Sequence, residues 1–120
     1  MNNRQCIVPR GKLLGGSSSI NTLMYSRGNC KDYDNWAQLG NHGRSWKHVL
    51  PYFKKSENSQ VHGDENYHGK GGLWNVENPQ PDSPLFQTFV NASLELKQPI
   101  VEYNGKNQIG ASHLQSNIKH

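Results

Sequence analysis

Apolar residues recur at intervals of three to four positions in several stretches of this chain, which is the spacing expected of one helix face. The pattern predicts four helices, at about 18–26, 32–39, 46–57 and 83–96. A weak alternation of apolar and polar residues predicts one short strand at 73–76. The sequence therefore indicates the α/β class, with helix and strand mixed (α+β) within these residues.

Capping residues and prolines mark two of these helices. Ser45 is a suitable N-cap for the helix at 46–57, and Pro51 inside that helix is expected to kink or break it. Ser83 followed by Pro84 is typical of a helix start, because proline is favoured at the first helical position. The helix that begins there is predicted to bury an apolar stripe, which consists of Leu85, Phe86, Phe89, Val90 and Leu94.

The stretches between the helices are polar or rich in glycine. Residues 56–72 have the composition of a mobile loop, and with the short strand they form a loop-and-strand region at about 56–80. Residues 108–120 are expected to be extended or irregular. The sequence shows no internal repeat.

Composition predicts a thin core. The chain has 120 residues, of which 32% are hydrophobic, and its mean hydropathy is -0.89. A chain this short and this polar buries little apolar surface by itself. We therefore expect it to be a piece of a larger protein that completes its buried surfaces.

Charge and hydropathy argue against two classes of partner. The net charge is +4, but the thirteen lysines and arginines are scattered, so no basic tract for nucleic acid is present. No apolar run approaches the ~20 residues of a membrane span. The N-terminal residues do not resemble a signal segment. The sequence does not indicate where the protein is located, and secretion of the complete protein remains open.

Histidine and cysteine residues do not form a recognisable site. The six histidines lack the spacing of zinc modules, so no metal site is predicted. Cys6 and Cys30 can pair or remain free, and two cysteines are too few to indicate the redox compartment.

The segment at 11–34 carries the most specific pattern. Gly15 and Gly16 precede three serines, and a glycine turn before a helix presents backbone N–H groups to an anion. Taken alone, the same letters also describe a loop and a capped helix without a ligand. A Walker-type phosphate loop is excluded, because Gly11-Lys12 precedes the glycine turn instead of following it.

The longer pattern resembles the first signature of the glucose-methanol-choline (GMC) oxidoreductases. The resemblance continues to Gly110 through the stretches RGNCKDYDNWAQLGN, VLPYFKKSE, YHGKGG and YNGKNQIG, and its flavour is that of arthropod glucose dehydrogenase-like proteins. Arg44 stands where the family usually has tryptophan. The signature itself is carried by Gly11, Lys12, Leu14, Gly15, Gly16, Ser17, Ser18, Ile20, Asn21, Tyr25, Gly28 and Asp34.

This resemblance implies a partial Rossmann-like FAD-binding fold over 1–120, with 83–120 as a helix and the start of the substrate-domain region. It implies an oxidoreductase that takes hydride from the CH-OH group of an alcohol or sugar and passes electrons to oxygen or a quinone. The FAD would be non-covalent, because Ile20 replaces the histidine that links FAD in some members. The implied cofactor-binding residues are Leu14, Gly15, Gly16, Ser17, Asn21, Thr22, Leu23 and Met24.

The resemblance places no catalytic residue in this chain. The catalytic histidine of the family belongs near its C-terminus, and the G-x-G-x-x-G fingerprint lies upstream of the signature. A truncated, non-catalytic chain of the same ancestry, acting as a binding piece, is the alternative. A fingerprint upstream and a histidine pair downstream in the gene would favour the enzyme.

Overall fold

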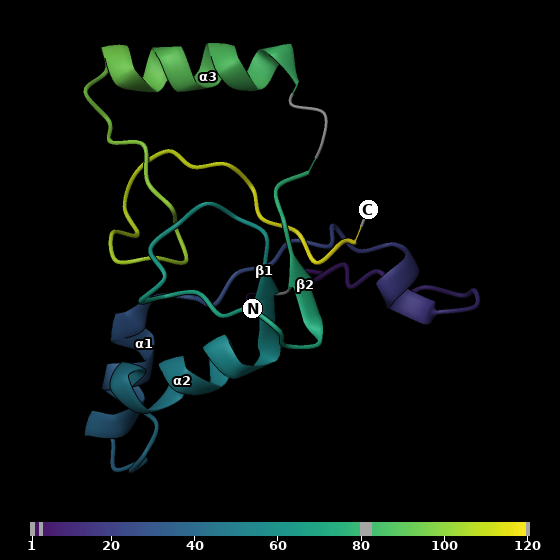
Figure 1. Ribbon diagram of the computed structural model, residues 1–120. Helices are drawn as coiled ribbons and strands as arrows, with labels where there is room; N and C mark the ends of the chain where they lie inside the picture. The colour runs from purple at the N-terminus through teal and green to yellow at the C-terminus, as the bar shows by residue number, and fades with distance from the viewer. Residues whose placement is uncertain (1, 3, 80–82, 120) are drawn as a thin grey trace.

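The computed structural model describes residue 2 and residues 4–79 and 83–119. Its elements are a 3-10 turn, η1 (Gly16–Ser19), helices α1 (Cys30–Gln38) and α2 (Trp46–Ser56), strands β1 (Glu57–Ser59) and β2 (Trp74–Val76), and helix α3 (Pro84–Glu95). Figure 1 shows α1 and α2 together on one side of the short sheet and α3 apart from them. The predicted mixture of helix and strand is confirmed.

Helices α1 and α2 are held together by aromatic side chains. The ring of Tyr33 lies 5.3 Å from that of Trp36, 5.5 Å from Trp46 and 5.8 Å from Phe53, measured between centroids. The N-terminus of α2 is also tied to α1, because the Trp46 backbone N–H donates to Asp34 Oδ1 at 2.9 Å. The two helices predicted at 32–39 and 46–57 are thus confirmed, and α2 continues through Pro51.

The sheet is small and parallel. β1 and β2 pair in the register Glu57 with Trp74 and Ser59 with Val76. β2 confirms the strand predicted at 73–76, whereas β1 falls in the stretch whose composition predicted only a loop. That stretch is strand at its start because Glu57 and Ser59 are buried and their backbone pairs with residues beyond the loop.

Helix α3 begins where the sequence predicted, and the Ser83 hydroxyl accepts from the Leu85 N–H at 3.3 Å. Its apolar stripe is not buried, which corrects the prediction: Leu85 is 78% exposed, and Phe89 and Leu94 are also exposed. The reason is positional, since α3 lies apart from α1 and α2 and the described residues provide little to cover it (Figure 1).

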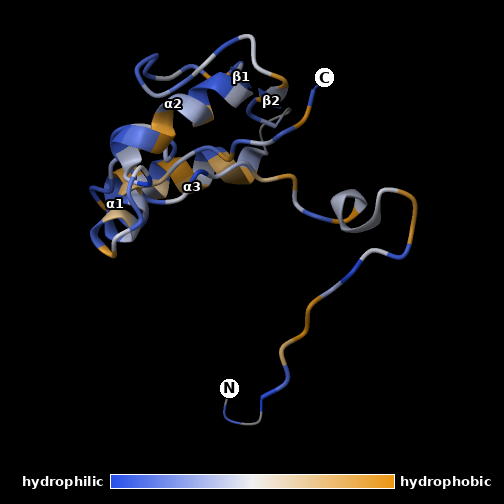
Figure 2. Ribbon diagram, turned by 90° about the horizontal axis from the view of Figure 1, so that it is seen from below, coloured by the Kyte–Doolittle hydropathy of each residue, from blue (hydrophilic) through white to orange (hydrophobic). Residues whose placement is uncertain are grey.

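The N-terminal segment extends away from the rest of the molecule. Figure 2 shows it, with η1, projecting from the body that contains the helices and the sheet. The segment joins the body at Met24, which forms an antiparallel bridge to Ser116, and Ser116 bridges Glu77 on its other side. The signature region is therefore anchored at its C-terminal end.

Candidate functional site

The glycine turn of the signature closes on itself. The Gly11 N–H donates to Ser17 Oγ at 3.2 Å, and the Gly16 N–H donates to the Leu13 carbonyl at 2.9 Å. A Cβ on Gly11 would lie 2.2 Å from the Gly16 carbonyl oxygen. Any side chain at position 11 would therefore displace the turn.

Two glycines shape the turn further. Gly15 and Gly16 have φ of 88° and 57°, the left-handed region that favours glycine. A Cβ built on Gly16 would meet nothing within 4 Å, so the chain leaves open space in front of this backbone. The turn thus has room for a ligand that approaches the backbone closely.

The helix predicted at 18–26 is wrong. Only η1 forms, and the chain after it is extended because a local turn competes with helix: Asn21 Oδ1 accepts from the Leu23 N–H at 2.8 Å. Leu23 then adopts a φ of 53°, uncommon for a non-glycine residue. The helix start that the glycine turn was expected to precede is therefore replaced by the short 3-10 turn η1.

Strand-like pairing fixes the end of this segment. The Asn117 N–H donates to the Leu23 carbonyl at 3.0 Å, and the Tyr25 N–H donates to the Gln115 carbonyl at 2.9 Å. These bonds hold the backbone on both sides of Met24, whose side chain remains 54% exposed. Leu23 is one of the residues expected to contact the cofactor, but nothing in the sequence indicated its left-handed backbone conformation.

The eight predicted cofactor-binding residues lie along one exposed stretch, with Gly16 half-buried. They form two groups, Leu14–Ser17 in the turn and 21–24 in the extended part. No hydrogen bond among the described residues joins the two groups. The first group offers Leu14, glycine backbone and a serine hydroxyl, and the second offers an amide, a hydroxyl and the apolar side chains of Leu23 and Met24.

The histidines, the cysteines and the possibility of a membrane span remain to be considered. The described residues contain no group of three or more histidine, cysteine or carboxylate side chains arranged to hold a metal ion. Cys6 and Cys30 are both free thiols. Among the described residues, no helix has the length and apolar character needed to cross a membrane.

A buried charge cluster lies behind the anchored end of the segment. It consists of Arg27, Glu57, His68 and Glu102, and the first three are at most 8% exposed. An Arg27 Nη2–Glu57 Oε2 ion pair joins the first two. His68 lies between the carboxylates, with Nδ1 3.0 Å from Glu57 Oε1 and Nε2 2.8 Å from Glu102 Oε2. This cluster was not predicted from the sequence.

The cluster shifts the pKa values of its members. Hydrogen bonds to Glu102 and Glu57 raise the pKa of His68 to about 9, against burial, which lowers it. Burial alone would raise the pKa of Glu102, but hydrogen bonds from His68 and Gln115 and its charge interaction with His68 lower it below its ordinary value. His68 is therefore cationic at neutral pH and Glu102 anionic.

These shifts predict how stability depends on pH. The pKa of His68 is higher in the folded state, about 9, than its ordinary value of 6.5. Its contribution to the free energy of unfolding is fully present below pH 6.5 and is lost as the pH rises to 9, with a slope of at most about 1.4 kcal/mol per pH unit. Denaturation midpoints of the complete protein between pH 6 and 9.5 measure the effect. A His68→Gln variant should lose this slope, and an unchanged slope would contradict the assignment.

Comparisons with known proteins agree with the signature. The profile of the GMC oxidoreductase family matches residues 1–120. An oxygen-dependent choline dehydrogenase of Brucella anthropi is 43% identical over 116 residues, which are 96% of this chain and 21% of the relative. The chain thus spans about a fifth of the length of such curated relatives.

Solved structures match the fold as well. An FAD-dependent oxidoreductase from Chaetomium thermophilum aligns with 98% of this chain and 22% of its own, with a TM-score of 0.84 and 33% identity. A pyridoxine 4-oxidase from Mesorbium loti aligns with 92% of this chain and 22% of its own, with a TM-score of 0.80 and 34% identity.

These matches settle the expectations at the level of the family. The expected cofactor, FAD, is confirmed at that level, since one matched structure is described as an FAD-dependent oxidoreductase. The narrower resemblance to arthropod glucose dehydrogenases is not supported, because the similar relatives are named choline dehydrogenases. The signature, the fold and the relatives together show that the chain belongs to the GMC oxidoreductase family.

Proposed function

We propose that the complete protein containing this chain is an FAD-dependent oxidoreductase acting on the CH-OH group of a small alcohol, a class that includes choline-like alcohols and sugars. The supporting observation is the signature at 11–34, carried on an exposed segment with open space before Gly16. When bound, FAD would supply the acceptor for the hydride that leaves the substrate carbon. The electrons then pass to oxygen or a quinone.

The chain's own part in this reaction is to hold the cofactor. Gly15, Gly16 and Ser17 would lie against the polar part of FAD, and 21–24 would contact the flavin ring. The open space before Gly16 and the exposed side chain of Met24 are consistent with such a contact. The base that takes the hydroxyl proton is proposed to lie outside residues 1–120.

The first test is the colour of the complete protein. We expect it to be yellow, to lose its flavin absorbance when an alcohol substrate is added without acceptor, and to release intact FAD on acid precipitation because Ile20 cannot form a covalent link. Absorbance of supernatant and pellet measures the release. A colourless protein would overturn the proposed function, and flavin retained in the pellet would overturn the non-covalent assignment.

Asn21 is expected to contact the flavin through its amide NH2, because its Oδ1 already accepts from the Leu23 N–H. Asn21→Leu should weaken FAD binding by about 1–3 kcal/mol, which is roughly 5- to 150-fold in Kd. Fluorescence titration of the apoprotein with FAD measures the loss.

The Asn21→Asp variant separates two roles of this residue. It keeps an oxygen that can hold the Leu23 turn but lacks the NH2 group. If the NH2 group contacts FAD, both variants bind weakly. If only the turn matters, Asn21→Asp binds as the wild type does, and wild-type affinity in both variants would show that the assignment is wrong.

A further inference from the structure

The hydrogen bonding of His68 requires a particular protonation state. Its two ring nitrogens face two different carboxylates, at 3.0 and 2.8 Å. A neutral imidazole has one N–H, so it can donate to only one of them, whereas the imidazolium donates to both. Glu57 is otherwise occupied by N–H donors from Arg27 and Gly69. The arrangement is thus balanced, with two cations and two anions, only when His68 is doubly protonated.

Glu102 connects this balance of charges to the turn that contains Asn104. Its second oxygen, Oε1, accepts from the Asn104 N–H at 2.9 Å and from Gln115 Nε2 at 2.5 Å. Asn104 is fully buried, and its side-chain NH2 also donates to Gln115 Oε1 at 2.6 Å. The carboxylate of Glu102 therefore organises Asn104 and Gln115 on one side while His68 neutralises it on the other.

The same two residues hold the end of the signature segment. Asn104 Oδ1 accepts from the Arg27 N–H at 2.9 Å, and Asn104 Nδ2 donates to the Tyr25 carbonyl at 3.2 Å. The Gln115 carbonyl accepts from the Tyr25 N–H at 2.9 Å. A continuous chain of hydrogen bonds thus runs from the His68 ring to the backbone that directly follows Met24.

We propose that this cluster is a proton-dependent clamp on the flavin-contacting segment, in which doubly protonated His68 keeps Glu102, Asn104 and Gln115 where they fix Tyr25 and Arg27. Loss of the proton leaves one of the two carboxylates without its N–H donor from the ring and removes the positive charge between them, which weakens the hold on the turn and on the segment end. His68 and Glu102 are then positioning residues. This inference rests on the proposed function of 21–24 as flavin contacts.

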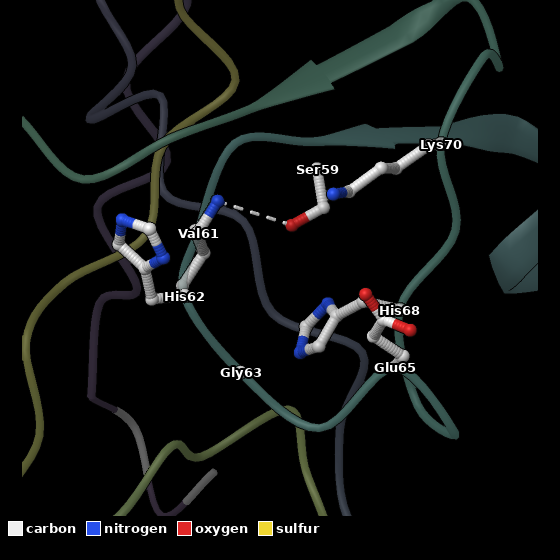
Figure 3. Close-up of a pocket in the computed structure, with 7 residues that line it drawn as sticks. All are labelled: Ser59, Val61, His62, Gly63, Glu65, His68 and Lys70. Atoms are coloured by element: carbon white, nitrogen blue, oxygen red, sulfur yellow. Dashed lines mark hydrogen bonds between the residues drawn. The ribbon is translucent and has the colours of Figure 1, made fainter.

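A cavity gives His68 a route for proton exchange. The ring borders a space of about 430 Å³, in which His62 lies across from it (Figure 3). Three charged groups belong to the cluster itself: Glu57 on β1, its ion-pair partner Arg27, and Glu102. The other charged or titratable groups are His62, Glu65 and Lys70, which line the cavity. Of these, Glu57 and Glu102 contact the ring nitrogens, so they dominate its protonation.

The experiment measures FAD affinity against pH in the complete protein. Apoprotein is titrated with FAD by fluorescence at pH 7 and pH 9.5, for the wild type, His68→Gln and His62→Gln. We expect the wild-type Kd to rise about threefold between these pH values, because about a quarter of His68 still carries its second proton at pH 9.5. His68→Gln should bind about tenfold more weakly at pH 7 and show no further loss. His62→Gln changes a histidine of the same cavity that has no carboxylate partner among the described residues, and it should behave as the wild type.

A second readout does not depend on FAD. The ring nitrogens of His68 are followed by NMR through the same pH range, and a single titration near 9 is expected. Titration near 6.5, or a wild-type pH dependence of Kd in His68→Gln, would overturn the clamp. If His68→Gln does not fold, Glu102→Gln and the wild-type titrations decide. Failure to bind FAD at all would overturn the proposed function as well, whereas FAD binding with a pH-independent Kd would overturn the clamp alone.

Discussion

Replacement of Glu57 by glutamine is expected to destabilise the complete protein by about 3–5 kcal/mol, because it leaves buried cations without their anion. Glu57 is 0% exposed, and its carboxylate accepts from Arg27, from His68 and from the Gly69 N–H. A glutamine of the same shape keeps one oxygen but turns an NH2 group toward these donors. The shift in the urea denaturation midpoint, with its slope, measures the loss.

Two matched variants test the cause. Glu65→Gln changes an exposed carboxylate at the edge of the same cavity and should alter stability by less than about 0.5 kcal/mol. The double variant Arg27→Met with Glu57→Leu removes both partners of the ion pair and should cost less than the sum of the single changes. Equal effects of Glu57→Gln and Glu65→Gln would show that the cluster does not support the fold.

The sequence predicted the elements that local signals determine. α1 and α2 follow the spacing of their apolar residues, and Ser83 with Pro84 marks the start of α3 correctly. These features depend on neighbours within a few positions, so one sequence is enough to find them. The burial of the α3 stripe was not predictable in the same way, because burial depends on what else lies against the helix.

The signature segment shows where local reasoning fails. Residues 18–26 have helical spacing, yet Asn21 bonds to the Leu23 N–H and Met24 pairs with Ser116, more than ninety positions away. The pairing with Ser116 gives the backbone hydrogen bonds that a helix would otherwise provide. An asparagine within an apolar run was the available signal, since its side chain competes with helix.

The charge cluster could not be derived from spacing. Its members come from four separate parts of the chain, and Arg27 and Glu57 are thirty residues apart. Arginine and glutamate are rarely buried unless they are paired, so residue type alone favours exposed positions for Arg27, Glu57 and Glu102. The available hint was that RGN and YHGKGG, which contain Arg27 and His68, belong to the stretches that resemble the family.

The described residues form few apolar contacts by themselves. Val76 and Ala111 are the buried hydrophobic residues among them, while most of the largest fully buried side chains are polar, such as Gln115 and Asn104. The radius of gyration is 17.1 Å, against about 13.6 Å expected for a compact domain of this length. Apolar burial drives folding, so this arrangement depends on surfaces supplied by the rest of a larger protein.

Residues 1–120 expressed alone are therefore expected to be partly unfolded, to bind FAD weakly and to show no oxidase or dehydrogenase activity. The exposed residues Leu85 and Phe89 would lack the partners that bury them, and the segment at 21–24 would be held by its pairing with Ser116 and Asn117. FAD fluorescence, circular dichroism and dye reduction with a panel of alcohols and sugars measure the three properties, with the complete protein as the control. FAD that is held only at its flavin end lacks contacts to its adenine part, so weak binding is expected. Tight binding with turnover by these residues alone would show that they form a complete site.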